Sequence, residues 1–189
     1  YLGGISNNKE LSPHLRSRKA VGDILRKSSS KVTEFQASIV VGKDSSSFII
    51  ISKIVEKVRF IFWPYEINSL CQPIALEDVL YYLEACLHKK ETERKIFCIG
   101  GSTKLKYYGL LKVYADEIGK KIIIIKIPFF PKKIISFFIA RLTNQKFSLV
   151  NYLIESLKYD SVCINENIKK IFPRKLLSYE EAIRNLNTK

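Results

Sequence analysis

The feature that most constrains the fold is an alternation of short apolar runs with longer segments of helical periodicity. Runs rich in β-branched and aromatic residues, as in buried strands, fall at 32–41, 60–64, 95–101 and 122–128. Helical spacing of apolar residues occurs at 14–27, 48–58, 79–87 and 110–118, and again at 151–158 and 179–186. Strands that alternate with helices predict an α/β fold with a largely parallel sheet.

Composition limits the classes of protein that remain. The chain of 189 residues is long enough for one domain, or for one domain with a small lobe. Its 47% hydrophobic and 26% charged residues exclude a disordered tail and a multi-span membrane protein. The net charge of +14 would attract nucleic acid or anionic lipid, yet the lysines are scattered and accompany many Ile, Asn, Phe and Tyr residues, as codon drift would also produce. We expect no specific nucleic-acid partner, because no aromatic and basic RNA-binding motif is present.

The cysteines suggest no metal or redox site. They form no CxxC pair and do not cluster with His14 or His88; they are Cys71, Cys86, Cys98 and Cys163. We therefore expect no metal and four free, buried thiols in a reducing cytoplasm. The start of the chain shows no signal peptide. Because the chain begins with Tyr1 and contains no methionine, we also expect it to be a partial product.

One apolar segment is flanked by positive charge. Residues 134–140 are almost entirely apolar, and Lys132, Lys133 and Arg141 bracket them. The segment is too short to span a bilayer. Two interpretations fit: an interfacial helix that gives peripheral membrane contact through 128–147, or burial in a lobe or substrate pocket.

The motifs of phosphate binding are absent from the sequence. A doubly wound domain that binds a dinucleotide needs a glycine-rich turn after its first strand, where the pyrophosphate approaches a helix N-terminus. No G-x-G-x-x-G, P-loop or nucleophile elbow occurs. Gly3-Gly4 and Gly100-Gly101 are isolated pairs, which turns alone would explain.

Several segments nevertheless share the order and spacing of one family. Residues 1–4, 11–18, 72–79, 97–101 and 173–177 resemble the atypical extended short-chain dehydrogenase/reductases, relatives of NAD-dependent epimerases and dehydratases. The resemblance covers nearly the whole chain. It implies an α/β fold that combines the C-terminal portion of a Rossmann-type parallel sheet with a smaller α/β substrate lobe.

The resemblance also implies how the chain is divided. The NAD(P)-binding part would be 1–44 and 71–101, and the substrate-binding lobe 45–70 and 102–189. The phosphate-binding turn would lie in a missing N-terminal Rossmann portion, the chain's expected partner. The expected cofactor is NAD or NADP, with an incomplete site in this chain.

The family's catalytic positions are degenerate here. Active members use a Ser or Thr, a Tyr and a Lys; by the resemblance the first falls on Gly3 or Gly4 and the others on His14 and Arg18. His14 could donate a proton near neutral pH, and Arg18 could contact the cofactor ribose. Alternatively, His14 is a residue of the helix cap and Arg18 a solvated or cofactor-contacting cation without catalysis.

The resemblance assigns cofactor contacts to Gly3, Gly4, Arg18 and residues 37–40, and substrate contacts to residues 46–48 and Gln72. Residues 37–40 would face the nicotinamide; they are Ala37, Ser38, Ile39 and Val40. Ser46, Ser47, Phe48 and Gln72 would contact the substrate, although a polar loop that caps the next helix would also explain the serines. Gln36 stands where the family has Arg, and Lys43-Asp44 where it has small residues.

Two functions follow from the resemblance. The first is a fragment of an NAD(P)-dependent oxidoreductase or epimerase/dehydratase that acts on a nucleotide-sugar or another small polar molecule. The second is a non-catalytic Rossmann-fold binding or assembly protein on a membrane complex. The degenerate catalytic triad leaves open whether the chain is an enzyme.

Overall fold

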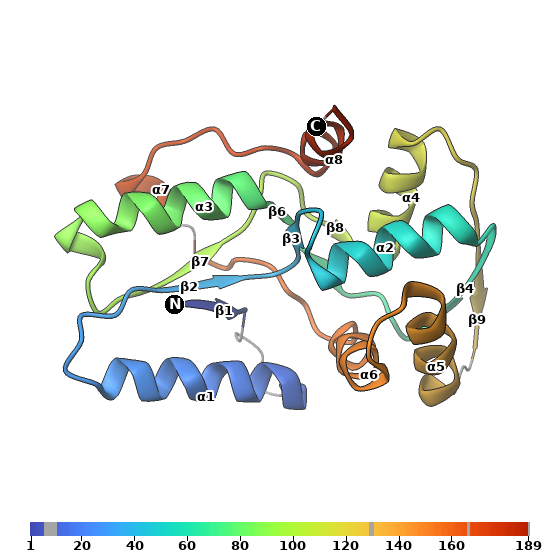
Figure 1. Cartoon of the computed structure of the whole chain (residues 1–189), viewed down its shortest axis with the longest axis horizontal. Helices are drawn as coiled ribbons and strands as arrows, with labels where there is room; N and C mark the ends of the chain where they lie inside the picture. Colours follow the sequence, from blue (N-terminus) through green and yellow to red (C-terminus); the bar gives the residue numbers. More distant parts are fainter. Residues whose placement is uncertain (6–10, 129–130, 166, 189) are drawn as a thin grey trace.

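The computed structural model describes residues 1–5, 11–128, 131–165 and 167–188. The molecule is elongated, with a sheet region at one end and a lobe at the other (Figure 1). The strands are β1 (Leu2–Gly4), β2 (Glu34–Ala37), β3 (Val40–Val41), β4 (Phe60–Pro64), β5 (Leu70–Cys71), β6 (Ile74–Ala75), β7 (Ile96–Ile99), β8 (Leu105–Lys106) and β9 (Ile123–Ile127). The helices are α1 (Pro13–Lys27), α2 (Ser46–Lys57), α3 (Leu76–Ala85), α4 (Tyr107–Glu117), α5 (Lys132–Thr143), α6 (Phe147–Ser156), α7 (Ile168–Ile171) and α8 (Tyr179–Thr188).

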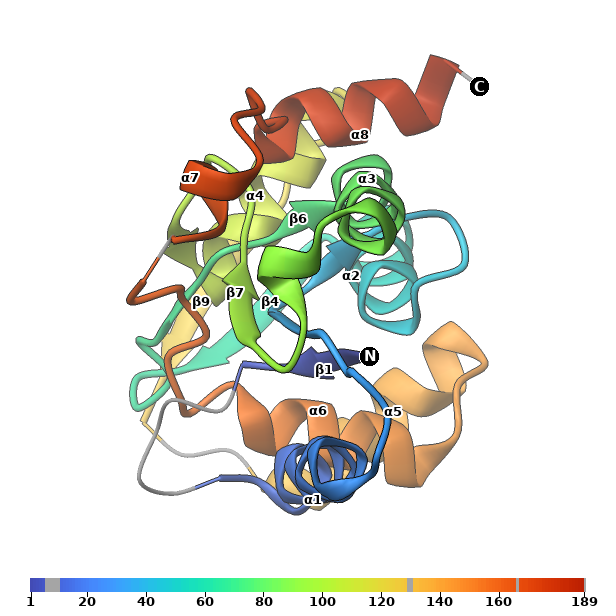
Figure 2. The ribbon, with the colours of Figure 1, turned by 90° about the vertical axis from the view of Figure 1, so that its left-hand side faces the viewer.

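The sheet region is built on three parallel strands in the order β1-β2-β7. Phe35 of the central strand lies opposite Leu2 on one side and Phe97 on the other. Helix α1 covers one face of this sheet and α3 the other, as two perpendicular views show (Figures 1 and 2). This three-layer arrangement with parallel strands confirms the α/β prediction.

Helix α1 is anchored to β2 by a buried carboxylate. Glu34 is 2% exposed, forms an ion pair with Arg26 and accepts a 2.8 Å hydrogen bond from Gln36. A Cβ at Gly22 would lie 2.6 Å from a Glu34 oxygen, so this position of α1 requires glycine. The contact fixes how α1 lies on the sheet.

The lobe contains a second parallel ladder and most of the remaining helices. Strands β4 and β9 pair over five residues each, and α2, α4 and α5 pack nearby. Two short ladders lie between the regions: β3 pairs with β6 in parallel, and β5 with β8 antiparallel. No helix among the described residues is long and apolar enough to cross a membrane.

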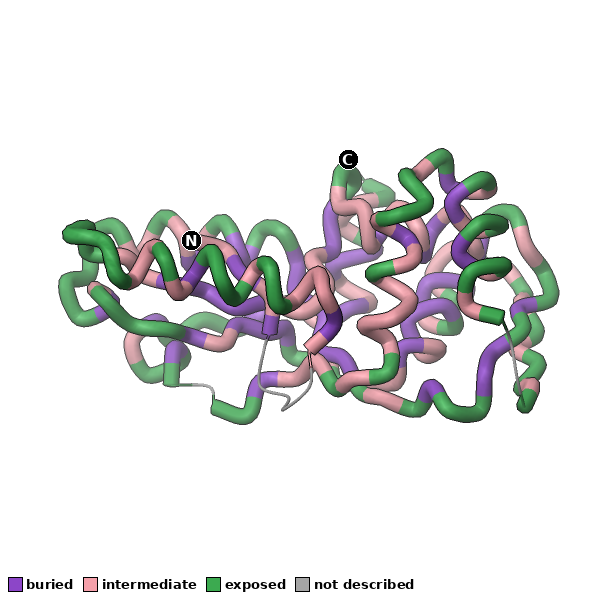
Figure 3. Tube along the Cα trace, turned by 90° about the horizontal axis from the view of Figure 1, so that it is seen from below, coloured by how far each residue is buried: buried purple, intermediate pink, exposed green. Residues whose placement is uncertain are grey.

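Two apolar cores correspond to the two regions. Phe35, Tyr82 and Phe97 belong to the core of the sheet region, whereas Phe48 and Leu110 belong to the core of the lobe. Figure 3 shows buried residues concentrated inside each region and exposed residues on the outer helices.

The tail of the chain returns to the sheet region. Ile168, Phe172 and Leu176 join its core, although the range 102–189 was expected to build the lobe. Asp78, fully buried on α3, accepts hydrogen bonds from Arg174 (2.9 Å) and from the Leu177 amide (3.0 Å). Residues 168–177 therefore form a strap on α3.

The predicted strand at 32–41 is wrong in one respect. The chain forms two short strands, β2 and β3, which belong to different sheets and are separated by Ser38 and Ile39. The Ile39 carbonyl accepts a 2.9 Å hydrogen bond from the Ile74 amide, which turns the chain toward β6. Continuous apolar sequence could not reveal this change of partner, because both strands are largely buried.

The expectation of four free thiols is also wrong. Cys98 of β7 and Cys163 of the segment after α6 form a disulfide, with their Cα atoms 5.5 Å apart. Cys71 and Cys86 are free. The two bonded cysteines are 65 residues apart in sequence, so no local spacing motif could predict the bond between them.

Candidate functional site

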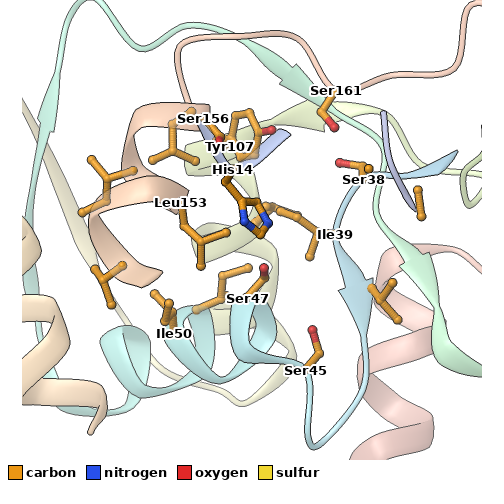
Figure 4. A pocket seen from close by; sticks show the side chains of 18 of the residues that line it. His14, Ser38, Ile39, Ser45, Ser47, Ile50, Tyr107, Leu153, Ser156 and Ser161 are labelled. Atoms are coloured by element: carbon orange, nitrogen blue, oxygen red, sulfur yellow. The ribbon is translucent and has the colours of Figure 1, made fainter. Parts of the chain in front are cut away.

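A pocket of about 310 Å³ lies where the sheet region meets the lobe. On the sheet side it is lined by Gly3 and Gly4 at the end of β1 and by residues 37–40 at the end of β2. The carboxyl ends of parallel strands are the usual place for ligands in open α/β sheets. Helices α1, α2, α4, α5 and α6 complete the walls (Figure 4).

The first turn of α1 is held against the pocket by its cap. Ser12 is the N-cap and Pro13 the first helical residue; Ser12 Oγ accepts a 3.3 Å hydrogen bond from the Leu15 amide. The Ser12 and Ser156 hydroxyls are 2.8 Å apart. Since Ser156 Oγ donates to the Tyr152 carbonyl (2.9 Å), Ser12 supplies the proton between the two serines. The cap thus joins α1 to the end of α6.

This arrangement places His14 in the wall of the pocket, where its ring is seen among the lining side chains (Figure 4). The N-cap is Ser12 and His14 is the second residue of α1, so His14 lies both in the capping region, as the non-catalytic alternative held, and in the pocket wall. Partial burial and, to a lesser extent, the charge of Arg18 lower the pKa of His14 below its ordinary value of 6.5. The imidazole is therefore neutral at pH 7.

Arg18 lies one turn further along α1 and lines the same pocket. Its guanidinium donates a 2.7 Å hydrogen bond to the Leu2 carbonyl, while the Tyr1 hydroxyl donates to the Arg18 carbonyl (2.8 Å). Its head group is thus fixed beside β1.

The paired glycines at the end of β1 allow α1 to approach. A Cβ at Gly4 would lie 2.7 Å from Leu15 Cδ2, and one at Gly3 would lie 3.2 Å from the Tyr1 ring. Both glycines line the pocket. Close helix packing alone explains the glycine at position 4, and the same absence of side chains leaves the strand end open to a flat ligand.

Residues 37–40, which the resemblance assigned to cofactor contacts, all line the pocket. Two of their carbonyls are engaged: that of Ala37 with the Ile5 amide (3.1 Å) and that of Ile39 with the Ile74 amide (2.9 Å). Ser38 lies between them. Its Oγ is buried and makes no hydrogen bond of ordinary geometry to the described residues.

The expected substrate contacts are brought together only in part. Ser47 lines the pocket, as does its neighbour Ser45, whose side chain makes no capping hydrogen bond to α2. Ser46 is not in the lining. Phe48 is buried in the lobe core, with its ring 5.5 Å from that of Tyr114. Phe48 is not in the lining, because its position on α2 turns it into the core.

Gln72 also has a structural role in place of the expected substrate contact. Its side chain is 1% exposed, donates to the Gly101 carbonyl (2.8 Å) and accepts from the Cys163 amide (3.0 Å). It therefore holds the disulfide-bonded segment against Gly101. A Cβ at Gly100 would lie 2.5 Å from Gln72 Cδ, and one at Gly101 would clash with the Pro73 carbonyl oxygen, so close packing explains the second glycine pair without a ligand.

Sequence reasoning missed two hydroxyls of the pocket. Tyr107 begins α4 and Ser161 follows α6; Figure 4 shows their hydroxyls on the same side as that of Ser38. Burial raises the pKa of Tyr107, and the hydroxyls of Ser161 and Ser38 act in the opposite direction. The phenol stays protonated and is a hydrogen-bond donor. In the sequence, only the apolar spacing of the segment that forms α4 indicated that Tyr107 points inward.

Comparison with known proteins gives a fold and no close relative. No protein-family model matches the sequence, and no curated protein matches it. Similar solved structures include a dTDP-4-dehydrorhamnose reductase from Bacillus anthracis in complex with NADP, at 10% identity and a TM-score of 0.67, with 99% of this chain and 59% of that one covered.

Two further structures share the fold. A nucleoside-diphosphate-sugar epimerase from Staphylococcus aureus has a TM-score of 0.68 at 11% identity and covers 97% of this chain. A triphenylmethane reductase from Citrobacter sp. has a TM-score of 0.69 at 11% identity and covers the whole of this chain. The chain spans 63% and 64% of these two proteins.

These structures confirm the expected fold, a partial Rossmann-type α/β arrangement. At 10–11% identity they establish the fold and nothing about activity.

Proposed function

We propose that this chain is the substrate-binding half of an NAD(P)-dependent oxidoreductase or epimerase. The observation that supports this most is the neutral His14 with Arg18 one turn later, both in a pocket at the carboxyl ends of β1 and β2. In an open parallel sheet this is the position of reactions on bound nucleotides. An imidazole is a proton carrier suited to pH 7.

We further propose the division of labour implied by the family resemblance. Residues 1–44 and 71–101 would hold the nicotinamide end of the cofactor, and 45–70 with 102–189 would hold the substrate, apart from the strap at 168–177. The two apolar cores and the pocket between them support this division.

The residues present fit the nicotinamide end of NAD or NADP and not its phosphates. Gly3 and Gly4 leave the strand end open, Arg18 offers further N–H groups, and the buried Ser38 hydroxyl has no ordinary hydrogen bond. When bound, the cofactor would supply the hydride acceptor or donor. The phosphates would bind a further Rossmann portion, whose last strand would pair with the outer edge of β1, a side with no partner among the described strands.

His14 would move the proton. Its lowered pKa keeps the imidazole in the base form at pH 7, which suits removal of a proton from a substrate hydroxyl. The carbon that carries this hydroxyl would lose its hydrogen as hydride, with two electrons. The hydroxyl proton would pass to the imidazole. Tyr107 would hold its own proton and donate a hydrogen bond.

Titration of NADH and NADPH by calorimetry tests this proposal. The samples are the 189-residue chain and a version extended by the residues encoded before Tyr1. Binding by the extended version alone is expected, because the chain lacks a phosphate-binding turn. Binding by neither version would overturn the proposal.

Turnover then tests His14. In the extended protein, with secondary alcohols and NAD or NADP, His14→Gln is expected to reduce the rate at least about 100-fold and leave dinucleotide affinity unchanged. His88→Gln is the matched control, since His88 is exposed and outside the pocket lining. Equal rates for the two variants would remove His14 from the mechanism.

The non-catalytic alternative is favoured by one surface. Helix α5 exposes Ile134, Phe137 and Phe138, which are 50%, 60% and 65% accessible, beside Lys133. Such a surface suits peripheral contact with anionic lipid within 128–147, a range whose residues 129–130 lie outside the described part. Sedimentation with phosphatidylserine vesicles tests it: a Phe137→Ser, Phe138→Ser variant should stay in the supernatant. Equal sedimentation of both proteins would remove this candidate.

A further inference from the structure

The walls of the pocket differ sharply in polarity from the rest of the molecule. The chain has 32 lysines and arginines. Within the described residues, Arg18 is the only one of them in the lining, and no carboxylate lines the pocket. His14 is neutral at pH 7 because its pKa is lowered. The lining therefore contains one fixed charge.

The lobe side of the pocket is apolar on several helices. Ile50 and Ile54 come from α2, Leu111 from α4, and Leu153 and Ile154 from α6. Figure 4 shows Ile50 and Leu153 directed into the space. These side chains offer no hydrogen bond to a ligand, so a polar group placed against them would lose its water without compensation.

A nucleotide-sugar finds little positive charge in these walls. Its two phosphates carry negative charge and are held by cations or by helix N-termini. The first turns of α1, α2 and α4 reach the lining at His14, Ser47 and Tyr107, but they bring no lysine or arginine into it. Arg18 is the single cation available, and it already donates to the Leu2 carbonyl at the strand end, where the nicotinamide would lie. The lobe wall holds no second cation among the described residues.

One end of the pocket is polar and uncharged. The hydroxyls of Ser38, Tyr107 and Ser161 lie there, on the side of the strand ends, with the His14 ring close by (Figure 4). Ser38 Oγ is buried without an ordinary hydrogen bond, and Tyr107 keeps its proton. Three other hydroxyls line the pocket: those of Ser45 and Ser47 at the start of α2, and that of Ser156, which is hydrogen-bonded to Ser12 and to the Tyr152 carbonyl. The polar end suits a small oxygen function, and the aliphatic side chains of α2 and α6 suit a hydrocarbon part.

We infer that the substrate is an uncharged, predominantly apolar alcohol or ketone, with its one oxygen at the Ser38 and Tyr107 hydroxyls and its hydrocarbon part against α2 and α6. The inference rests on the proposed function for its chemistry and replaces the expectation of a nucleotide-sugar or other small polar substrate. With NAD(P)⁺ held beside Gly3 and Gly4 to supply a hydride acceptor, His14 would take the hydroxyl proton of the alcohol, and the ketone would remain. In the reverse direction the ketone would receive the hydride and the proton.

Binding to the 189-residue chain alone tests the substrate class, because the apolar wall needs no cofactor. The probes are the methyl ketones 2-butanone, 2-hexanone and 2-octanone, with UDP-glucose for comparison, measured by calorimetry. We expect affinity to rise about fourfold for each added methylene, as burial of about 0.8 kcal/mol per CH₂ dictates. We expect no binding of UDP-glucose. Equal affinities along the ketone series, or binding of UDP-glucose alone, would overturn the inference.

A variant locates the binding in the pocket. Leu153→Phe should fill the space and abolish the gain from 2-butanone to 2-octanone, whereas Leu87→Phe, at a 78% exposed position, should keep it. Ile50→Phe makes the same test from α2 if Leu153→Phe does not fold. The inference would be overturned if Leu153→Phe and Ile50→Phe both left the ketone affinities unchanged.

The two proposals fail separately. Ketone binding by this chain with no dinucleotide binding by the extended protein would leave the apolar site and remove the oxidoreductase. Dinucleotide binding with UDP-glucose in place of ketones would leave the oxidoreductase and remove the apolar substrate.

Discussion

The two regions that meet at the pocket contribute to it in different ways. The sheet region supplies Ser38 from a strand end and His14 and Arg18 from the first turns of α1, where the Ser12 cap and the hydrogen bond from Arg18 to Leu2 fix the helix. The lobe supplies side chains of helices, and on α2 and α6 these are mainly aliphatic. The strand ends are thus suited to hold reacting atoms, and the helices to select the ligand by shape and polarity.

Removing a core side chain from the sheet region has the largest expected effect and tests whether the two regions depend on each other. Phe35 is fully buried, with its ring 6.1 Å from those of Tyr82 and Phe97. We expect Phe35→Ala to lower the free energy of unfolding in urea by about 3–5 kcal/mol. Phe62→Ala on β4 should change it by less than about 0.5 kcal/mol, because Phe62 is 52% exposed.

The shape of the urea unfolding transition of Phe35→Ala shows whether the two regions unfold together. Since β2 continues into β3 and the strap joins the tail to α3, we expect Phe35→Ala to shift one cooperative transition. Two transitions, with the lobe unchanged at its original midpoint, would show that the two cores unfold independently.

The disulfide is the next test, because it ties the segment of Ser161 to strand β7. Cys163→Ser should lower the free energy of unfolding by about 2–4 kcal/mol, as expected for a bond that closes a loop of 65 residues. Cys86→Ser, at a free thiol, should have a small effect. Reductant should destabilise the parent protein and leave Cys163→Ser unchanged.

Thiol counting checks the same bond directly. Under denaturing conditions without reductant, only Cys71 and Cys86 should react with a thiol reagent. Reaction of all four cysteines would show that Cys98 and Cys163 are reduced, and the stability difference between the two serine variants should then vanish.

Much of the fold was accessible from sequence because apolar runs and helical spacing report burial. The strand at 60–64 and the helix at 48–58 agree closely with β4 and α2. The change of sheet at Ser38 was not accessible, since two consecutive buried strands look like one. The predicted helix at 151–158 begins earlier, at Phe147, because Phe147 and Val150 continue its apolar face.

The candidate site was accessible only where residues lie close in sequence. His14 and Arg18 were identified as an i, i+4 pair, and residues 37–40 as one strand end, and all line the pocket. Tyr107 and Ser161 reach the same space from segments far apart in the chain. Periodicity cannot report that kind of proximity, nor could it separate the inward Phe48 from the pocket residue Ser47.

The smallest expected effect concerns charge at the strand end. The pKa of His14 lies below 6.5 because of burial and, second, the positive charge of Arg18. In Arg18→Gln the electrostatic contribution is lost and the burial contribution stays, so the pKa should rise part of the way toward 6.5. Titration of the His14 ring protons by NMR measures it, with His14→Gln to assign the resonance.

The same shift makes folding stability depend on pH. A histidine whose folded pKa lies below its unfolded value binds a proton less readily in the folded protein, so its contribution to stability falls as pH drops through 6.5 toward the folded pKa. The fall should be shallower in Arg18→Gln, where the proton meets less repulsion. If the titration midpoint of His14 stayed unchanged in Arg18→Gln, the guanidinium would not act on the imidazole. Burial alone would then account for the lowered pKa of His14.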